Sequence, residues 1–590
     1  MNAAVRSVLV LSLAVVAPPV VAADADKKSA RELAGLWEAK RRFGPDIRGT
    51  LTIEQTADGW RAEIAGRRAP VRVTGDAVAF ELPDGQGSFK GKFVAERASI
   101  IGHWVQPSRV ENGTAYASPA TLANCGKDRW RGVVTPLDDE MTLYLMARAK
   151  DDGSVGVFLR NPDRNLGRFL DDARLEREGE AVRIVVPGDR GQKRRVMAEG
   201  SKRDDGLSLY VPPVGATFDF RRVNENAASD FYPRGRPTAA YGYVPPPADD
   251  DGWPTATLAD VGISRDGIEK FVRMLVDTPI DSVHSQEVHG FLLARHGKLV
   301  VEEYFHGEHR EKPHDTRSAS KSLTATLTGA AIRAGLPIDV STPVYRAMNG
   351  GQFPGDLEPR RRSLAVEHLL TMSSGLDCDD KSDSSVGNEN TMQEQKAQPD
   401  WYRYTLDLRM VRDPGEKSVY GSANANLLGG VLARSAGRPL PELFHELIAQ
   451  PLRINHYYMN LTPTGDAYMG GGMRLLPRDF MKLGQLMLNG GTWNGRRILT
   501  PEWCRAAATP RYELAGIHYG YLWWVIDYPY KDRTVRGFFA GGNGGQVVID
   551  IPELDLVIAF YGGNYGDRAT YIPQREYAPK FILPAVDAGG

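Results

Sequence analysis

Cysteine and net charge are both scarce in this sequence. The three cysteines among 590 residues, Cys125, Cys378 and Cys504, are too few and too scattered for a disulfide framework or a cysteine-based metal site. Their odd number leaves at least one unpaired within the chain, and the sequence does not determine which pair, if any, forms a bridge. Lys and Arg number 73 against 74 Asp and Glu, and no polybasic run stands out. We therefore expect no nucleic-acid partner.

Long apolar segments are also missing, except at the N-terminus. The stretch from Val8 to Val16 is apolar, follows Arg6 and leads to small residues up to Ala23. This pattern predicts a signal peptide over residues 1–23, and the abrupt polarity that follows disfavours the alternative of a short buried helix. No later segment is long and apolar enough to cross a bilayer. We expect a periplasmic or secreted protein with no stable membrane span.

Residues 30–223 show the signature of a β-rich domain. Apolar and polar residues alternate along short runs that end at Asp-Gly or glycine-rich turns, such as residues 49–55 before Asp58-Gly59. Trp37 and Trp130 each begin a similar succession of runs, which suggests two β meanders. The pattern predicts an N-terminal all-β barrel or sandwich, because an open sheet of this length would leave edges to protect. This β-rich domain either holds a ligand or packs against the next domain, and we take packing as the default.

The composition changes after residue 223. Residues 224–253 are rich in proline, glycine and aspartate, which predicts an extended linker. From residue 254 to residue 590 helical and strand patterns alternate, including a hairpin in which residues 291–295 and 299–305 flank a His-Gly-Lys turn. This region is expected to form a second domain, of the α/β class and of mixed topology.

Ser318 and Lys321 stand three residues apart at the start of an apolar helical pattern. Positions i and i+3 share a helix face, so a hydroxyl and an amine would lie side by side. A serine hydroxyl is a weak nucleophile, and a lysine whose pKa is lowered by burial or charge can activate it. With Asp315 or Thr316 as the cap, Ser318 would lie at the positive end of the helix dipole. The structural alternative is a capped helix start with a solvated lysine.

Two later stretches carry residues that suit catalysis. Tyr420 and Ser422 come just before a predicted helix, and a phenol near a lysine can relay a proton from nucleophile to leaving group. Residues 541–545 are glycine-rich and lead into a predicted strand, where the backbone can approach a ligand and donate N–H groups to an oxyanion. Each stretch has a structural alternative, a core tyrosine in the first case and a glycine-rich hairpin in the second.

The order Ser318-x-x-Lys321, Tyr420-x-Ser422 and Ala540-Gly541-Gly542 resembles the three motifs of penicillin-binding-protein-like serine hydrolases, the class C β-lactamase-related group. That group includes esterases, 6-aminohexanoate-dimer hydrolases and D-alanyl-D-alanine carboxypeptidases. The resemblance implies an α/β (α+β) beta-lactamase/transpeptidase-like domain, with an antiparallel sheet and a helical cluster, over residues 254–590. We place this chain near the esterase and 6-aminohexanoate-dimer hydrolase branch.

The resemblance also implies a mechanism. Ser318 would attack a carbonyl carbon and form an acyl-enzyme, with neutral Lys321 and Tyr420 as the acid and base. The sequence does not determine which of these two is the initial base. The backbone N–H groups of Ser318 and Asn543 would hold the oxyanion. The other supporting residues that the resemblance implies are Ser422 and Gly542.

Two departures from the family pattern bear on the substrate. Ser422 stands where the second motif usually ends in asparagine, and Ala540 stands where the third usually begins with lysine or histidine. The missing cation favours esters or amides over β-lactams or D-Ala-D-Ala peptides, although a distant arginine could substitute. The alternatives are a D-amino-acid peptidase and a non-catalytic sensory or binding protein.

We expect a small-molecule, short-peptide or ester substrate and no cofactor or metal. Three neighbouring histidines have a spacing that fits no common metal signature; they are His306, His309 and His314. The oligomeric state cannot be read from the sequence.

Overall fold

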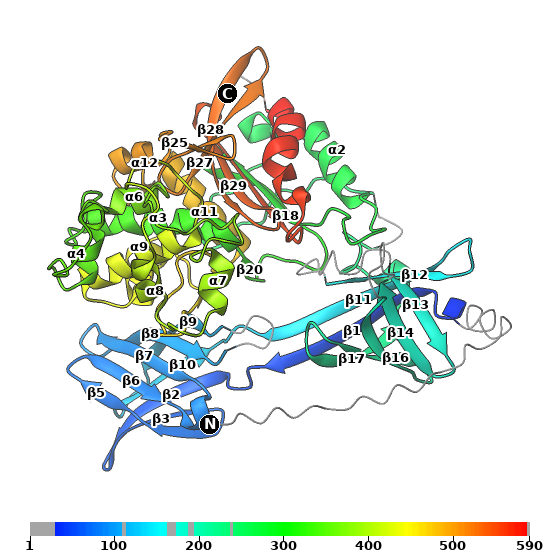
Figure 1. Cartoon of the computed structure of the whole chain (residues 1–590), viewed down its shortest axis with the longest axis horizontal. Helices are drawn as coiled ribbons and strands as arrows, with labels where there is room; N and C mark the ends of the chain where they lie inside the picture. Colours follow the sequence, from blue (N-terminus) through cyan, green and yellow to red (C-terminus); the bar gives the residue numbers. More distant parts are fainter. Residues whose placement is uncertain (1–29, 109–113, 162–172, 187–193, 236–239, 587–590) are drawn as a thin grey trace, which may run out of the picture. The chain divides into compact units, whose positions relative to one another are not determined.

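The structure is a computed structural model that describes residues 30–108, 114–161, 173–186, 194–235 and 240–586. The predicted signal peptide, residues 1–23, lies outside the described residues. The chain divides into two compact units (Figure 1). The described parts of Met1–Lys40, Leu143–Arg160 and Arg168–Glu225 form the first unit, and those of Arg41–Thr142, Asn161–Gly167 and Asn226–Gly590 form the second.

A closed β-barrel dominates the first unit. In barrel order its strands are β1 (Gly35–Gly44), β11 (Asp139–Ala149), β12 (Val155–Arg160), β13 (Arg174–Glu178), β14 (Ala181–Val186), β15 (Arg195–Lys202), β16 (Gly206–Val211) and β17 (Ala216–Arg222). Trp37 pairs with Arg222 where β1 meets β17. Along β17, Phe218 and Phe220 are buried while their neighbours are exposed, as strand alternation requires. The predicted N-terminal β-rich architecture is confirmed in this general form.

A larger sheet belongs to the second unit. In sheet order its main strands are β4 (Arg67–Pro70), β3 (Gly59–Ile64), β2 (Gly49–Thr56), β10 (Arg129–Val134), β9 (Tyr116–Asn124), β8 (Ser99–Gln106), β7 (Ser88–Val94), β6 (Ala77–Glu81) and β5 (Arg72–Thr74). Its core includes Phe89, Trp104, Leu122 and Trp130, all buried. The sequence pattern predicts one domain over residues 30–223, whereas in the structure residues 41–142 group with the C-terminal region.

Strand β9 explains this grouping, because it continues the large sheet into the C-terminal region. It pairs with β21 (Tyr457–Asn460), and β21 pairs with β22 (Arg474–Leu475), which in turn pairs with β20 (His314–Asp315). The buried His103 of β8 also makes a 2.8 Å hydrogen bond with the Tyr457 hydroxyl. A continuous backbone ladder therefore runs from the large sheet to the residues just before Ser318.

The C-terminal region is built on a second sheet. Its order is β19 (Lys298–Tyr304), β18 (Val288–Arg295), β30 (Leu556–Gly562), β29 (Gln546–Ile551), β28 (Arg533–Gly542), β27 (Trp524–Tyr530), β26 (Ile517–Tyr519) and β25 (Tyr512–Leu514). The predicted hairpin before residue 305 is confirmed by the β18–β19 pairing. All described neighbours in this sheet are antiparallel, so the mixed topology expected from alternating elements is wrong. Strands β25 to β30 follow one another through short connections, which can join only antiparallel neighbours.

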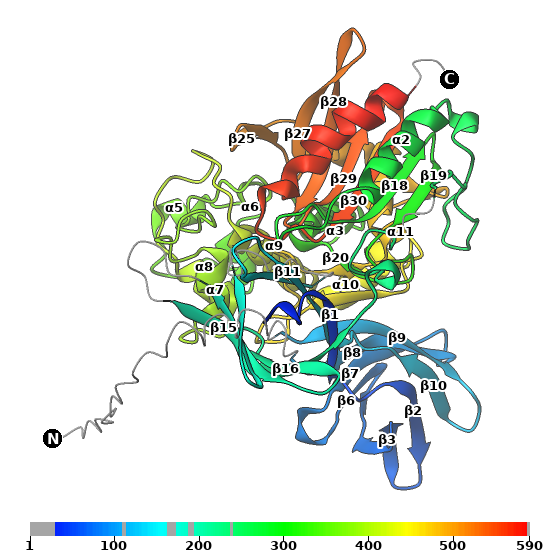
Figure 2. The ribbon, with the colours of Figure 1, turned by 90° about the vertical axis from the view of Figure 1, so that its right-hand side faces the viewer.

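Helices cover both faces of this sheet. Figure 2 shows α2 (Arg265–Val276) on the same side as the C-terminal helix Pro573–Ile582. Against the opposite core lie α3 (Ser320–Arg333), α9 (Ser422–Ala436) and α11 (Pro477–Leu488). Other α-helices of the described residues are α4 (Val344–Met348), α5 (Pro359–Arg362), α6 (Val366–Leu370), α7 (Glu389–Glu394), α8 (Trp401–Asp407), α10 (Leu440–Phe444) and α12 (Pro501–Ala507). Within the described ranges, none of the helices has the length and apolarity that a membrane crossing requires.

The proline-rich segment between the β region and this domain is anchored at two aromatic residues. Tyr243 is buried against the face that carries α2, and its hydroxyl donates to the Val300 carbonyl oxygen at 2.8 Å. Trp253 is buried in the opposite core, where its ring meets that of Trp493. Burial of these rings ties the segment to the C-terminal region.

Candidate active site

Ser318 lies in a single 3-10 turn, Arg317–Ala319, which leads directly into α3. The predicted helix is confirmed, but the Thr316 side chain does not cap it. The Thr316 hydroxyl instead donates to the Met473 carbonyl oxygen at 2.7 Å, while Asp315 accepts the Arg317 N–H at 2.8 Å. The carboxylate therefore organises the turn, and the threonine attaches it to the neighbouring strand.

Lys321 reaches back from the first turn of α3 to the serine. Its Nζ donates to Ser318 Oγ at 2.8 Å and also to the Gly470 carbonyl oxygen. Burial opposes the charged amine, but Tyr420 and two nearby carboxylates outweigh burial and raise the pKa of Lys321. These neighbours therefore favour the charged form of the amine, while the neutral form that the resemblance implies stays a prediction.

Tyr420 emerges just before α9, as predicted, and faces Lys321. The Lys321 Nζ lies 5.1 Å from the centre of the Tyr420 ring. On its other side the ring stacks on Trp524, with centroids 5.8 Å apart. The structure thus brings Ser318, Lys321 and Tyr420 together from distant parts of the chain.

Ser422 faces a carboxylate that the sequence analysis did not consider. Its N–H and its hydroxyl both donate to Asp380 Oδ2 at 2.7 Å. Asp380 Oδ1 accepts from the backbone N–H of Glu389, whose own carboxylate accepts from Tyr468 at 2.6 Å. Burial raises the pKa of Asp380 more than the Lys321 ammonium lowers it. Ser422 therefore positions an acidic pair near Lys321 instead of contacting the serine directly.

The third motif packs against the turn that holds Ser318. A Cβ at Gly542 would lie 2.5 Å from the Thr316 carbonyl oxygen, so a side chain there would displace this turn. Asn543 follows the end of β28, and its Oδ1 accepts from the Gly566 N–H at 2.9 Å. Its place beside the turn suits the predicted oxyanion role, which stays a prediction, as does that of the Ser318 N–H.

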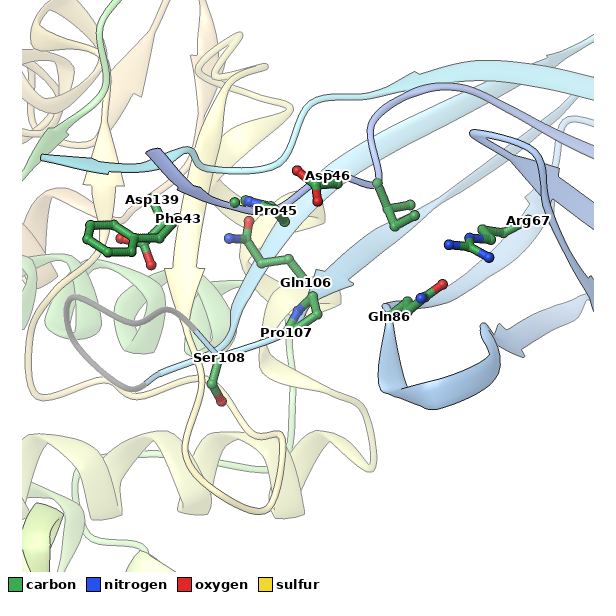
Figure 3. A pocket seen from close by; sticks show the side chains of 11 residues that line it. Phe43, Pro45, Asp46, Arg67, Gln86, Gln106, Pro107, Ser108 and Asp139 are labelled. Atoms are coloured by element: carbon green, nitrogen blue, oxygen red, sulfur yellow. The ribbon is translucent and has the colours of Figure 1, made fainter. Parts of the chain in front are cut away.

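At least two cavities lie in the described part of the second unit. One, with a volume of about 360 Å³, borders the nucleophile turn and is lined partly by Asp315, Arg317 and Arg474. Figure 3 shows the other, of about 280 Å³, whose lining includes Gln106 and Asp139. None of the residues that line this second cavity belongs to the three motifs, so only the first is a candidate extension of the site.

The cysteines and histidines do not form a metal centre in the part of the chain that the structure describes. Cys125 is exposed, and Cys378 and Cys504 are buried, each as a free thiol. No cluster of three or more His, Cys, Asp or Glu side chains there has metal-binding geometry. His289 and His314 instead contact each other, with 2.8 Å between Nδ1 and Nε2.

Several residues around Lys321 were missed by sequence reasoning. Asp380 lies in the loop between α6 and α7, Glu389 begins the short helix α7, and no spacing connects them with Ser318. Gly470 contributes only a backbone oxygen, which leaves no side-chain signal. Arg317 was visible as the neighbour of Ser318, but adjacency alone does not tell where its side chain points.

Comparisons with known proteins agree with this geometry. A family model described as Beta-lactamase matches residues 282–566. A 6-aminohexanoate-dimer hydrolase from Paenarthrobacter ureafaciens is 26% identical over 227 residues, which cover 36% of this chain and 55% of that protein. A beta-lactamase from Escherichia coli is 25% identical over 160 residues, covering 27% of this chain and 37% of that protein. The chain thus matches only part of each relative's length.

Part of the chain is also similar to solved structures. A penicillin-binding protein homolog from Caulobacter crescentus aligns with 52% of this chain and 94% of its own, at 16% identity and a TM-score of 0.39. The family model matches the part of the chain that contains Ser318, and a relative named as a hydrolase matches part of the chain as well. Residues 282–566 are thus similar to the family described as Beta-lactamase, and part of the chain is similar to a 6-aminohexanoate-dimer hydrolase.

Proposed function

We propose that this chain is an exported serine hydrolase that cleaves an ester or an amide through an acyl-enzyme on Ser318. The contact of 2.8 Å between Lys321 Nζ and Ser318 Oγ carries the proposal. A hydroxyl beside a buried amine that also contacts a phenol is an arrangement suited to proton transfer. Export rests on the N-terminal segment that ends near Ala23.

The raised pKa of Lys321 shapes the proposed proton route. Because its surroundings favour the charged form of Lys321, this residue acts together with Tyr420 as a pair that takes the proton of Ser318. The Ser318 oxygen then forms a bond with the carbonyl carbon, and the N–H groups of Ser318 and Asn543 hold the oxyanion. Tyr420 protonates the leaving group. Water attacks the acyl-enzyme and gives one proton to the Lys321–Tyr420 pair, and the pair returns one proton to the Ser318 oxygen as the acid is released.

The surroundings of Tyr420 favour an acyl group with an apolar portion. Trp524 is only partly buried, stacks on Tyr420 and lies against Phe539, so it offers an aromatic wall beside the reacting atoms. Ala540 is fully buried and adds no charge to the third motif. The name of the Paenarthrobacter relative, a 6-aminohexanoate-dimer hydrolase, makes amides of linear amino acids reasonable candidates beside short-chain esters.

Covalent labelling by a fluorophosphonate and hydrolysis of p-nitrophenyl butyrate test the proposal. We expect labelling of the wild type at Ser318 and none in S318A, whose ester hydrolysis should fall to background. Y420F should retain labelling at a reduced rate and lose about 10²–10⁴-fold in kcat, the usual contribution of general acid–base catalysis. Nitrocefin should be turned over weakly or not at all.

The rival functions give different outcomes. Equal absence of labelling and turnover in wild type and S318A would favour a non-catalytic binding or sensory protein. Faster hydrolysis of D-amino-acid peptides than of any ester would favour the peptidase alternative. Efficient nitrocefin turnover would contradict the argument from Ala540.

A further inference from the structure

The Asp380 carboxylate joins the second motif to the loop between α6 and α7, and the proposed mechanism gives it no role. Its Oδ2 accepts from both the N–H and the hydroxyl of Ser422 at 2.7 Å. Its own backbone N–H donates to the Tyr420 carbonyl oxygen at 2.9 Å. Asp380 thus binds the chain on both sides of Gly421. We call these hydrogen bonds the Asp380 clamp, because they hold the backbone that carries the Tyr420 phenol.

Further contacts fix the Asp380 clamp in place. Asp380 Oδ1 accepts from the Glu389 N–H at 2.8 Å, at the start of α7, so both carboxylate oxygens have donors. A side chain at Gly421 would collide with the Cys378 carbonyl oxygen, so the loop and the second motif lie in direct contact. Hydrogen bonds to an ionised carboxylate are among the stronger ones in proteins. The loop therefore holds the backbone of the second motif in one defined position.

The same carboxylate lies near the amine that contacts Ser318. Lys321 is buried, and burial disfavours its charged form, whereas Tyr420 and the carboxylates of Glu389 and Asp380 favour that form. Among the described residues, the titratable groups that face the amine thus come from the second motif, from α7 and from the loop before α7. Asp380 therefore acts on both members of the Lys321–Tyr420 pair, on one through hydrogen bonds and on the other through charge.

A short path of contacts joins Lys321 to Glu389. The Lys321 amine donates to the Gly470 carbonyl oxygen. A side chain at Gly470 would collide with the Tyr468 hydroxyl, which donates to Glu389 Oε1 at 2.6 Å. The Tyr468 ring is buried, and its centroid lies 5.5 Å from that of Trp401. The packed tyrosine therefore holds the second carboxylate close to the amine.

We propose that Asp380 is a positioning residue of the Ser318 reaction. The Asp380 clamp holds Tyr420 beside Lys321, and the charge of Asp380, together with that of Glu389, makes the pair hold its protons more tightly. This inference rests on the proposed function, because it concerns the pair that takes the proton of Ser318. Asp380 supplies both hydrogen bonds and charge, whereas the Glu389 side chain supplies charge from outside the clamp.

The pH dependence of p-nitrophenyl butyrate hydrolysis separates these two contributions. The pair must lose a proton before it can take that of Ser318, so kcat/KM should rise with pH along an acidic limb. A nearby negative charge makes this loss harder, so its removal should move the acidic limb to lower pH. The release of nitrophenol is followed at its isosbestic wavelength, so that the signal does not itself depend on pH.

The variants differ in which contribution they remove. D380N removes the charge and weakens the clamp, so the acidic limb should move down by about one pH unit and kcat should fall about 10–100-fold with little change in KM. D380E keeps the charge but displaces the carboxylate, so the limb should stay while kcat falls. E389Q removes a charge, and its amide oxygen can still accept from Tyr468. The limb should therefore move in E389Q with a smaller loss in kcat than in D380N.

D377N is the matched control from the same loop. Asp377 contacts Arg409 at 3.0 Å and takes no part in the Asp380 clamp. The substitution makes the same chemical change as D380N a few residues away. We therefore expect D377N to keep both the acidic limb and the kcat of the wild type.

The outcomes separate this inference from the proposed function. An unchanged acidic limb in both D380N and E389Q would overturn the inference even if kcat falls, because lost packing alone explains a lower kcat. A limb that moves to higher pH, or that moves equally in D377N, would overturn it too, and wild-type kcat in both D380N and D380E would refute the clamp. If D380N fails to fold, as judged by circular dichroism, the limb of E389Q decides. Absence of any Ser318-dependent hydrolysis in the wild type would refute the proposed function itself.

Discussion

The two β regions look alike in sequence but differ in how their strands find partners. The barrel of the first unit closes on itself through β1 and β17. The large sheet of the second unit instead shares β9 with the C-terminal region, where Ala117 pairs with Met459. Alternation of apolar and polar residues predicts a strand in both cases, but a strand's partner decides which unit it stabilises.

This difference predicts how the chain unfolds. The ladder from β9 through β21 and β22 reaches Asp315, and the core of the C-terminal region includes Ala117 of β9. Cooperative unfolding follows shared core contacts and hydrogen bonds. We therefore expect the large sheet to unfold together with the sheet of the C-terminal region (β18, β19 and β25–β30, the hydrolase sheet), and the barrel to unfold in a separate transition.

Two matched core truncations should break this comparison most strongly. Leu122 of β9 and Leu209 of β16 are both fully buried, one in each β region. Each Leu→Ala change should cost about 2–5 kcal/mol by removing buried methyl groups and leaving a cavity. L122A should lower the temperature at which ester hydrolysis is lost. L209A should lower only the temperature at which the barrel unfolds, which hydrogen exchange of barrel peptides measures.

The outcome is read from activity and exchange together. If L209A reduces the heat resistance of ester hydrolysis as much as L122A does, the two β regions are equally coupled to the site and the comparison fails. If L122A leaves both hydrolysis and hydrolase-sheet exchange unchanged, the β9–β21 ladder carries no cooperativity. The isothermal kcat/KM of both variants at low temperature serves as the control for a direct effect on the site.

A buried aspartate offers the opposite change, a gain in stability. Asp550 of β29 is fully buried, packs against Gly484 of α11, and has no hydrogen-bond partner for either carboxyl oxygen within the described residues. Burial raises the pKa of Asp550 well above its ordinary value. D550V should stabilise the hydrolase sheet by about 1–3 kcal/mol at neutral pH, because it removes an unpaired buried polar group.

The pH dependence fixes the cause of this effect. The unfolded chain ionises Asp550 near its ordinary pKa, about 4, while the folded chain keeps the proton, so the native state loses stability as pH rises above that value. The gain from D550V should therefore be small near pH 4 and grow toward neutrality in chemical unfolding. The exposed Asp219 of the barrel strand β17 provides the control D219V, for which no such growth is expected. A constant gain across this pH range would contradict protonation as the cause. Slower exchange of β7 and β8 in D550V would support joint unfolding.

Local patterns account for much of this fold. The β-rich region, the hairpin before residue 305, and the helix after Ser318 follow from periodicity and turn residues, which act over short stretches. The pairing of Ala117 with Met459 joins residues far apart in the chain, and no local signal specifies it. The same reason explains why residues 41–142 group with the C-terminal region when the sequence suggests one domain over 30–223.

The candidate site divides in the same way. The order of the three motifs predicted Ser318, Lys321 and Tyr420 from the sequence, because their residue types and spacings indicate the chemistry. The raised pKa of Lys321 depends on Tyr420, Glu389 and Asp380, and the position of Asp380 follows from its hydrogen bonds to Ser422 and not from any spacing. Charge balance around a buried amine is a property of the folded chain, so the sequence alone does not determine it.

The smallest expected effect concerns a charge pair between the large sheet and α10. Lys92 of β7 contacts Glu442 at 2.6 Å and is 41% exposed, and Arg438 also contacts this glutamate at 2.8 Å. K92A should lower stability by less than about 1 kcal/mol and should lose its effect in about 1 M salt, because solvent and salt screen exposed pairs and Arg438 still pairs the glutamate. R194A, which removes the contact with Glu176 inside the barrel, is the matched control. Should K92A lower the heat resistance of ester hydrolysis as strongly as L122A, this pair, and not the buried β9–β21 ladder, would couple the sheet to the hydrolase.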